Sequence, residues 1–228
     1  MPGLPDWDSR QMASRDDSPR QHPGKAPAIV VDVALALAAT LLMMRAQLPA
    51  LLNQLLGIAF GLLTAVHMWQ HRTWLKSLTR GRLTGRRLVS VIGMGAVLAC
   101  TVALVASGLL MSTWATNLGI SAGTGGARAL HLPLSNLLYC LVGTHAGLSA
   151  KGTSRLPRPA LVAWVAAAAA GIWSFVALGF GAYIMGTAGF ASLDPTKPAV
   201  LSFVQYATVF ALFALVGAAI QRAFSRNG

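Results

Sequence analysis

The sequence predicts an all-α membrane protein with six transmembrane helices, and three observations point to this class. The 228 residues are 55% hydrophobic and only 11% charged, and their mean hydropathy is +0.60. Six apolar stretches come close to the roughly 20 residues that a helix needs to cross a hydrocarbon core about 30 Å thick. Lys and Arg gather between alternate stretches, as a membrane topology requires.

The six expected spans follow one another with short connections. They are Ala28–Ala46, Leu51–Leu75, Leu88–Thr113, Ala129–Ala150, Pro159–Gly186 and Ala199–Phe224. The first is the least uniform, because Asp32 and Arg45 sit near its ends, where both side chains can reach the interface. Residues 1–27 are rich in Pro, Ser, Asp and Arg, so we expect a disordered cytoplasmic tail and no signal peptide. Residues 28–150 should form a four-helix bundle, and residues 151–228 add two transmembrane helices and a short C-terminus.

The positive charges predict the orientation. Fifteen of the 18 Lys and Arg residues lie in the N-terminal tail, in the second and fourth connections and at the C-terminus. Only Arg45, Arg128 and Lys197 fall on the opposite side. The positive-inside rule then places both termini in the cytoplasm. We interpret the basic loops as topology signals, and expect no nucleic-acid partner.

The shortage of acidic residues excludes several kinds of site. The chain has no Glu, and Asp32 and Asp194 are the two Asp residues outside the tail. Carboxylate-bridged metal pairs, paired-carboxylate hydrolysis and glutamate proton relays therefore lack their ligands or acids. There is also no Gly-rich phosphate loop, CxxC pair or nucleophile elbow. Cys100 and Cys140 lie inside apolar spans, where packing is favoured over a disulfide.

Four of the five histidines fall inside apolar spans, where ionisable side chains usually mark a site. His131 and His145 are fourteen residues apart, which places them on one face of the fourth span about 21 Å apart along the axis. His67 and His71 share a face near the cytoplasmic end of the second span.

The second and fourth spans run in the same direction, so the depths of their histidines can be compared. His67 and His145 each follow the start of their span by about 16 residues, and His71 follows by about 20. Imidazoles that face each other across a helix bundle at one depth are what bis-histidine haem ligation requires. Glycines accompany these histidines at Gly57, Gly61, Gly143 and Gly147. Such glycines either clear room for a porphyrin or serve ordinary helix packing.

Three short motifs resemble a known family. They are His67-Met-Trp-Gln-His71-Arg-Thr-Trp74, then Ser107-Gly108, then His131 followed by Gly143-Thr-His145-Ala-Gly147-Leu. The first four spans resemble small bacterial membrane proteins related to the cytochrome b subunits of respiratory hydrogenases and formate dehydrogenases. The resemblance implies haem b as cofactor, the bacterial inner membrane as location, and partner subunits of a redox complex.

The resemblance also implies ligands. His131 and His145 would each ligate one haem, and the cytoplasmic-side haem would take His67 as its second ligand, with His71 as the competing choice. The outer haem lacks a second histidine, since Asn53, fourteen residues before His67, occupies one such place. The remaining outer candidates are a thioether from Met43, Met44 or Met111, and propionate partners in Arg45 and Arg128. The alternative, which we favour, is one haem, with His131 hydrogen-bonding a quinone or another helix.

These observations lead to one hypothesis and three competitors. The hypothesis is a haem b subunit that passes electrons between the quinone pool and a redox partner, and is not a stand-alone enzyme. The first competitor is a haem-free structural or assembly subunit of a membrane complex. The others are a transporter, for which no inverted repeat is visible, and a copper or zinc site that includes His67 and His71.

Overall fold

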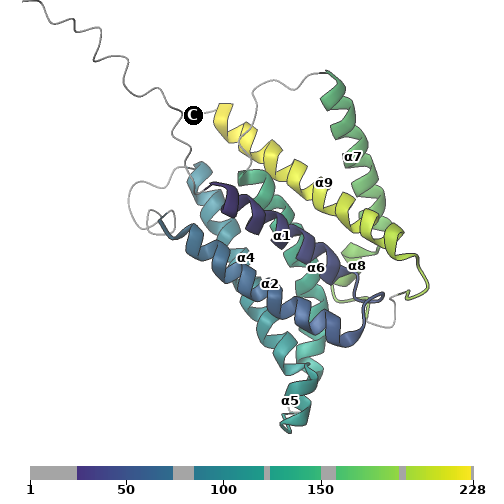
Figure 1. Cartoon of the computed structure of the whole chain (residues 1–228). Coiled ribbons are helices and arrows are strands. Elements are labelled where there is room, and N and C mark those ends of the chain that lie inside the picture. The colour runs from purple at the N-terminus through teal and green to yellow at the C-terminus, as the bar shows by residue number, and fades with distance from the viewer. Residues whose placement is uncertain (1–24, 74–84, 121–123, 150–157, 190–193, 227–228) are drawn as a thin grey trace, which may run out of the picture.

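The computed structural model describes residues 25–73, 85–120, 124–149, 158–189 and 194–226. Within these ranges the chain is all-helical, with six long helices and two short ones. The long helices are α1 (Lys25–Met43), α2 (Ala50–Gln70), α4 (Gly85–Leu110), α6 (Thr124–Ser149), α7 (Arg158–Ala177) and α9 (Ala199–Arg226). The short ones are α5 (Thr113–Asn117) and α8 (Phe180–Ile184), and Figure 1 shows all eight along the chain. The all-α prediction is confirmed for the described residues.

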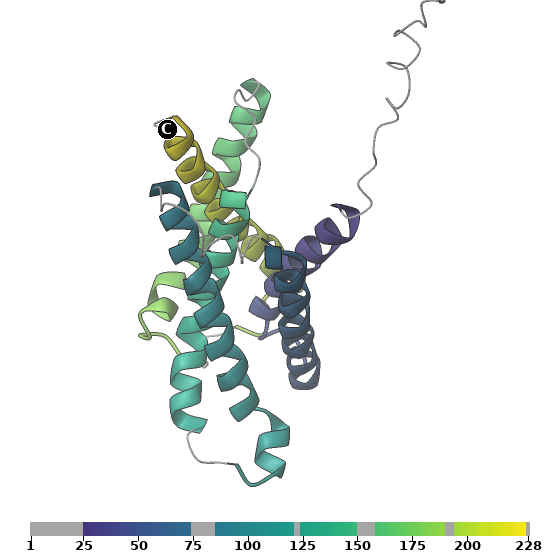
Figure 2. The same cartoon turned by 90° about the vertical axis from the view of Figure 1, so that its left-hand side faces the viewer.

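The long helices lie side by side in one elongated bundle and alternate in direction (Figures 1 and 2). Asp32 near the start of α1 contacts His67 near the end of α2, and Ser107 near the end of α4 contacts His131 near the start of α6. We call the end where α1 starts and α2 ends the basic end, because the predicted cationic loops belong there. The other end is the opposite end.

Among the described residues, three helices are apolar and long enough to cross a membrane. They are Ala50–Gln70, Arg87–Leu110 and Ala199–Phe224, and Ala28–Met43 and Val162–Ala177 form shorter apolar helices. Large apolar side chains stay exposed on the outward faces, and Leu62 and Trp69 on α2 are 65% and 69% exposed. Such a surface is costly in water and natural in lipid. The structure therefore supports a membrane protein in contact with a bilayer.

Some helix ends differ from the predicted spans. Helix α2 stops at Gln70, so His71 lies in the turn after the helix and not within it. The predicted fifth span is interrupted after Ala177, because Gly179 adopts a left-handed conformation with φ of 66° before α8 begins. Helix α1 begins at Lys25, and the rest of the predicted N-terminal tail lies outside the described residues.

A buried tyrosine of α6 makes polar contacts with both α1 and α9 in the centre of the bundle. Tyr139 on α6 donates its hydroxyl hydrogen to the carbonyl oxygen of Tyr206 on α9 at 2.8 Å. The same hydroxyl lies 3.0 Å from the Oγ1 atom of Thr40 on α1. Phe180 and Val209 are fully buried beside it. This cluster holds α1 against the α6–α9 pair. It therefore fixes the position of α6, the helix that carries His131 and His145.

Helices α6 and α9 run in the same direction and approach closely through glycines. A Cβ atom on Gly143 would lie 3.0 Å from the Phe210 carbonyl oxygen, and one on Gly147 would meet the backbone of Ala214. Gly217 on α9 approaches the Thr144 carbonyl in the same way. Small residues that let two backbones approach are the common means of packing helices in membranes. Of the two roles left open by the sequence, Gly143 and Gly147 therefore serve packing.

We expect Gly147→Ala to destabilise the protein by about 1–3 kcal/mol, because the new methyl group meets rigid backbone that cannot rotate away. Thermal unfolding in detergent measures the effect. Gly95→Ala on α4 is the matched control, since a Cβ atom there meets nothing within 4 Å. Equal stability of the two variants would contradict the close α6–α9 contact.

Candidate cofactor site

The basic end of the bundle brings together three of the four predicted histidines. His67 on α2 and His145 on α6 have ring centres 6.4 Å apart, and their planes are nearly perpendicular at 81°. The ring of His71 lies 4.6 Å from that of His67 but is exposed beyond the end of α2. His67 and His145 are both half-buried. The structure therefore brings His67 and His145 together at one depth, as the count of residues along the two spans predicts.

Asp32 is a member of this cluster that sequence reasoning missed. Its Oδ1 atom lies 2.8 Å from Nδ1 of His67, with the side chains 50% and 26% exposed. From its place near the start of an apolar stretch, this carboxylate is expected at the membrane interface. A usable signal existed in the predicted spans, because Asp32 comes 14 residues before the end of the first span at Ala46 and His67 comes 16 residues after the start of the second at Leu51. In an antiparallel pair of helices, such positions lie at similar depth.

The distance between the two ring centres is compatible with one metal held between two imidazoles. Metal–imidazole bonds are about 2.0–2.1 Å long, so two imidazoles on opposite sides of one metal have ring centres roughly 6–6.5 Å apart. The 6.4 Å between His67 and His145 falls in this interval. Asp32 occupies Nδ1 of His67 and so leaves Nε2 to bind a metal, the arrangement usual for histidine ligands. His71 has no such carboxylate contact within the described part of the chain.

The same residues allow a second arrangement. One ligand atom each from Asp32, His67 and His71 lie within 4.8 Å of one another, close enough to hold a single metal ion. This set excludes His145 and contains one carboxylate and two imidazoles, which suits a small divalent cation. It corresponds to the copper or zinc alternative raised by the sequence, now with Asp32 as a third ligand.

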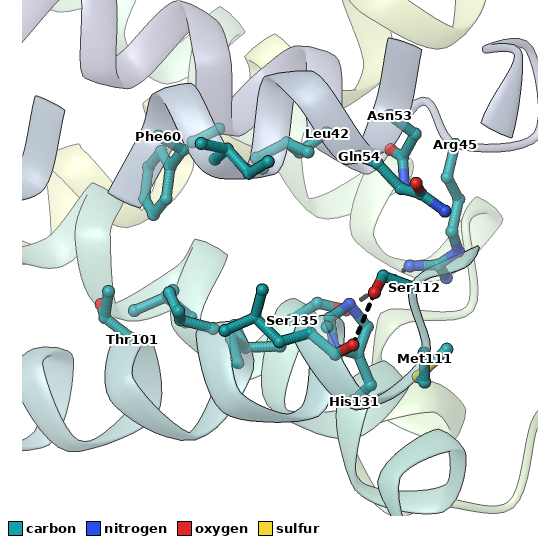
Figure 3. A pocket seen from close by; sticks show the side chains of 18 of the residues that line it. Leu42, Arg45, Asn53, Gln54, Phe60, Thr101, Met111, Ser112, His131 and Ser135 are labelled. Atoms are coloured by element: carbon teal, nitrogen blue, oxygen red, sulfur yellow. Dashed lines mark hydrogen bonds between the residues drawn. The ribbon is translucent and has the colours of Figure 1, made fainter. Parts of the chain in front are cut away.

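A cavity of about 320 Å³ opens between α1, α2, α4 and α6, toward the opposite end of the bundle (Figure 3). Figure 3 shows most of the labelled polar side chains at one end of it, with Phe60 and Thr101 at the other and Leu42 between. The polar residues that line it include Arg45, Asn53, Gln54, Ser112, His131 and Ser135. Its volume is at the lower end of the range for small-molecule sites, about 300–1,000 Å³.

His131 is fixed against the wall of this cavity. Its Nδ1 atom lies 2.9 Å from Oγ of Ser107, which leaves Nε2 for another partner. Gly108 makes room for the ring, since a Cβ atom there would lie 3.4 Å from Cε1 of His131. In the Ser107-Gly108 motif of α4, the serine thus contacts the His131 ring and the glycine leaves room for it.

Across the cavity from α6 stands Asn53, the residue that occupies the place of an expected second outer histidine. Its Oδ1 atom is buried and has no hydrogen-bond partner among the described residues. Of the proposed thioether ligands, Met43 and Met111 line the cavity, whereas Met44 packs in the apolar core. Arg45 lines the cavity and donates to Ser135 at 3.4 Å, whereas Arg128 is exposed and is not part of the lining.

The remaining glycines behave differently from Gly143 and Gly147. Gly57 lines the cavity, and a Cβ atom there would meet nothing within 4 Å. A Cβ atom on Gly61 would lie 3.7 Å from Cγ2 of Val105 on α4. Gly57 therefore keeps cavity space open, and Gly61 belongs to the α2–α4 contact.

Comparison with family models, with curated proteins and with solved structures finds no match to this chain.

Proposed function

We propose that this chain is a membrane subunit that holds one b-type haem between His67 and His145 and passes electrons between the quinone pool and a redox partner. The observation that supports it best is the 6.4 Å separation of these two rings, which come from different helices and meet at one depth. An imidazole pair of this kind is the donor set of a bis-histidine haem.

We propose further that all six long helices cross the bacterial inner membrane, with both termini in the cytoplasm. The alternating helix directions and the three long apolar helices support six crossings. The distribution of Lys and Arg supports the orientation, because fifteen of 18 cations then lie on the cytoplasmic side. His67, His71 and His145 then lie near the cytoplasmic surface, and His131 lies near the outer one.

Each residue of the site has a definite task. His145, on the α6 wall fixed by Tyr139, and His67, on α2, would hold the haem through one ring nitrogen each. Asp32 accepts the Nδ1 hydrogen of His67, which holds the ring in one tautomer and one orientation. The apolar residues around the half-buried His67 and His145 would lower the local polarity and so tune the potential of a bound haem. The haem, when bound, supplies the one-electron chemistry.

The partners follow from the position of the site. A haem held by His67 and His145 would lie near the cytoplasmic surface, where the cationic connections predicted by the sequence could dock an acidic partner subunit or anionic lipid. The competing proposal is a haem-free subunit, in which Asp32, His67 and His71 serve structure or hold a divalent cation.

The test is the haem content of the protein purified from haem-replete cells. We expect one extractable haem b per chain. A haem-free protein that carries stoichiometric zinc or copper would establish the competing proposal instead.

We expect Asp32→Asn to retain the haem and to raise its reduction potential. The amide oxygen still accepts a hydrogen bond from Nδ1, but the negative charge that stabilises the oxidised, more positive iron is gone. A spectroscopic redox titration measures the shift. Asp194→Asn, which changes an acidic residue at the opposite end of the bundle, is the matched control. An unchanged reduction potential in Asp32→Asn would show that Asp32 does not contact a histidine that ligates the haem.

A further inference from the structure

The cavity at the opposite end of the bundle offers one imidazole where a second bis-histidine haem would need two. His131 lines it from α6, and on the α2 side the polar side chains are the carboxamides of Asn53 and Gln54. A carboxamide is a poor axial ligand for iron but a good hydrogen-bond partner. The cavity is therefore matched to a ligand that is held by hydrogen bonds.

Asn53 indicates which kind of ligand the cavity would bind. A buried acceptor without a donor costs about 1–3 kcal/mol, and few are found in native proteins. Oδ1 of Asn53 is such an acceptor among the described residues, and it belongs to a side chain of the cavity wall. A ligand hydroxyl that donates to Oδ1 would remove this cost.

His131 provides a second polar contact at the same end. Oγ of Ser107 lies 2.9 Å from Nδ1, so Nε2 remains for the ligand, and Gly108 leaves room for the ring, because a Cβ atom there would lie 3.4 Å from Cε1. Toward the middle of the bundle, the wall includes Leu42 and Phe60 beside Thr101, whose hydroxyl donates to the Val97 carbonyl of its own helix (Figure 3). The ligand must combine hydroxyl groups on a compact head with an apolar body.

We propose that this cavity binds a lipid-soluble quinol, with one hydroxyl donating to Asn53 and the other meeting His131. The site lies between membrane helices, which selects ligands that partition into the bilayer. The choice of a quinol rests on the proposed electron-transfer function, whereas the existence of a hydrogen-bonding site rests on the cavity alone. The quinol site then lies on the outer side, apart from the His67–His145 pair.

Binding is tested with tetramethyl-1,4-benzoquinol and purified protein in detergent, by equilibrium dialysis under argon. The wild type is expected to bind one quinol per chain saturably. Asn53→Leu and His131→Phe should each weaken binding at least about tenfold, which is the loss of one well-formed buried hydrogen bond. Thr64→Val is the control, because its hydroxyl on α2 donates to the Phe60 carbonyl of its own helix and does not line the cavity.

Thermal unfolding of the quinol-free protein separates a binding role from a structural one. Since Oδ1 of Asn53 is unsatisfied without ligand, Asn53→Leu should leave the melting temperature unchanged or raise it. A lower melting temperature for this variant, or equal quinol binding by the wild type and both cavity variants, would overturn the proposal.

Haem is counted in the same samples. A second haem that disappears in His131→Phe would show that the cavity is a haem site, and would also overturn the proposal. A wild type that contains no haem but still binds the quinol would contradict the proposed function and leave the quinol site supported. Failure of the proposed function and failure of the quinol site are therefore distinguishable.

Discussion

His145→Ala is expected to abolish haem binding. Within the described part of the chain, His145 is the imidazole of α6 that faces His67, at 6.4 Å between ring centres. Without His145, one imidazole of the pair would remain to hold the haem, and no neighbouring side chain on α6 would replace the lost ligand. The haem content of the purified variant should fall from about one haem per chain to a small fraction of that.

The matched control is His131→Ala on the same helix, fourteen residues earlier and in the separate cavity. It removes an imidazole from the same membrane helix and should retain the haem. Full haem in the His145 variant, or loss of haem in the His131 variant alone, would refute the assignment of ligands.

His67→Ala and His71→Ala are expected to differ sharply, although the residues are one helical turn apart. His67 is half-buried, is held by Asp32 and faces His145, whereas His71 is exposed beyond the end of α2. We therefore expect haem loss from the His67 variant and haem retention in the His71 variant. The absorbance spectrum of each purified variant measures this difference.

The same pair of variants distinguishes haem from a divalent cation. The cluster of Asp32, His67 and His71 would need both imidazoles, so each substitution should then release the cation. Equal loss of bound metal from both variants, with no haem in the wild type, would favour that alternative.

The helices and the main pairing of histidines could be predicted from the sequence because both depend on local pattern. Apolar runs of membrane length predict the positions of the long helices, and a count of residues along two spans of the same direction predicts that His67 and His145 meet. Neither inference needs knowledge of side-chain contacts. The choice between His67 and His71 stayed open, because it depends on where α2 ends.

The features that the sequence did not predict depend on contacts between distant helices. Asp32 was assigned to the membrane interface because its partner, His67, lies thirty-five residues away. Gly143 and Gly147 were compatible with a porphyrin or with packing, and only the position of α9 decides between these roles. The cavity was not predicted either, since Asn53 and His131 reach it from helices that adjoin only in the folded bundle.

The most direct test of the central claim is a dithionite-reduced minus oxidised absorbance spectrum of the protein, purified from cells with ample haem. A bis-histidine haem between His67 and His145 predicts the bands of a low-spin b-type cytochrome, with one haem per chain. A spectrum without any b-type band would contradict the account.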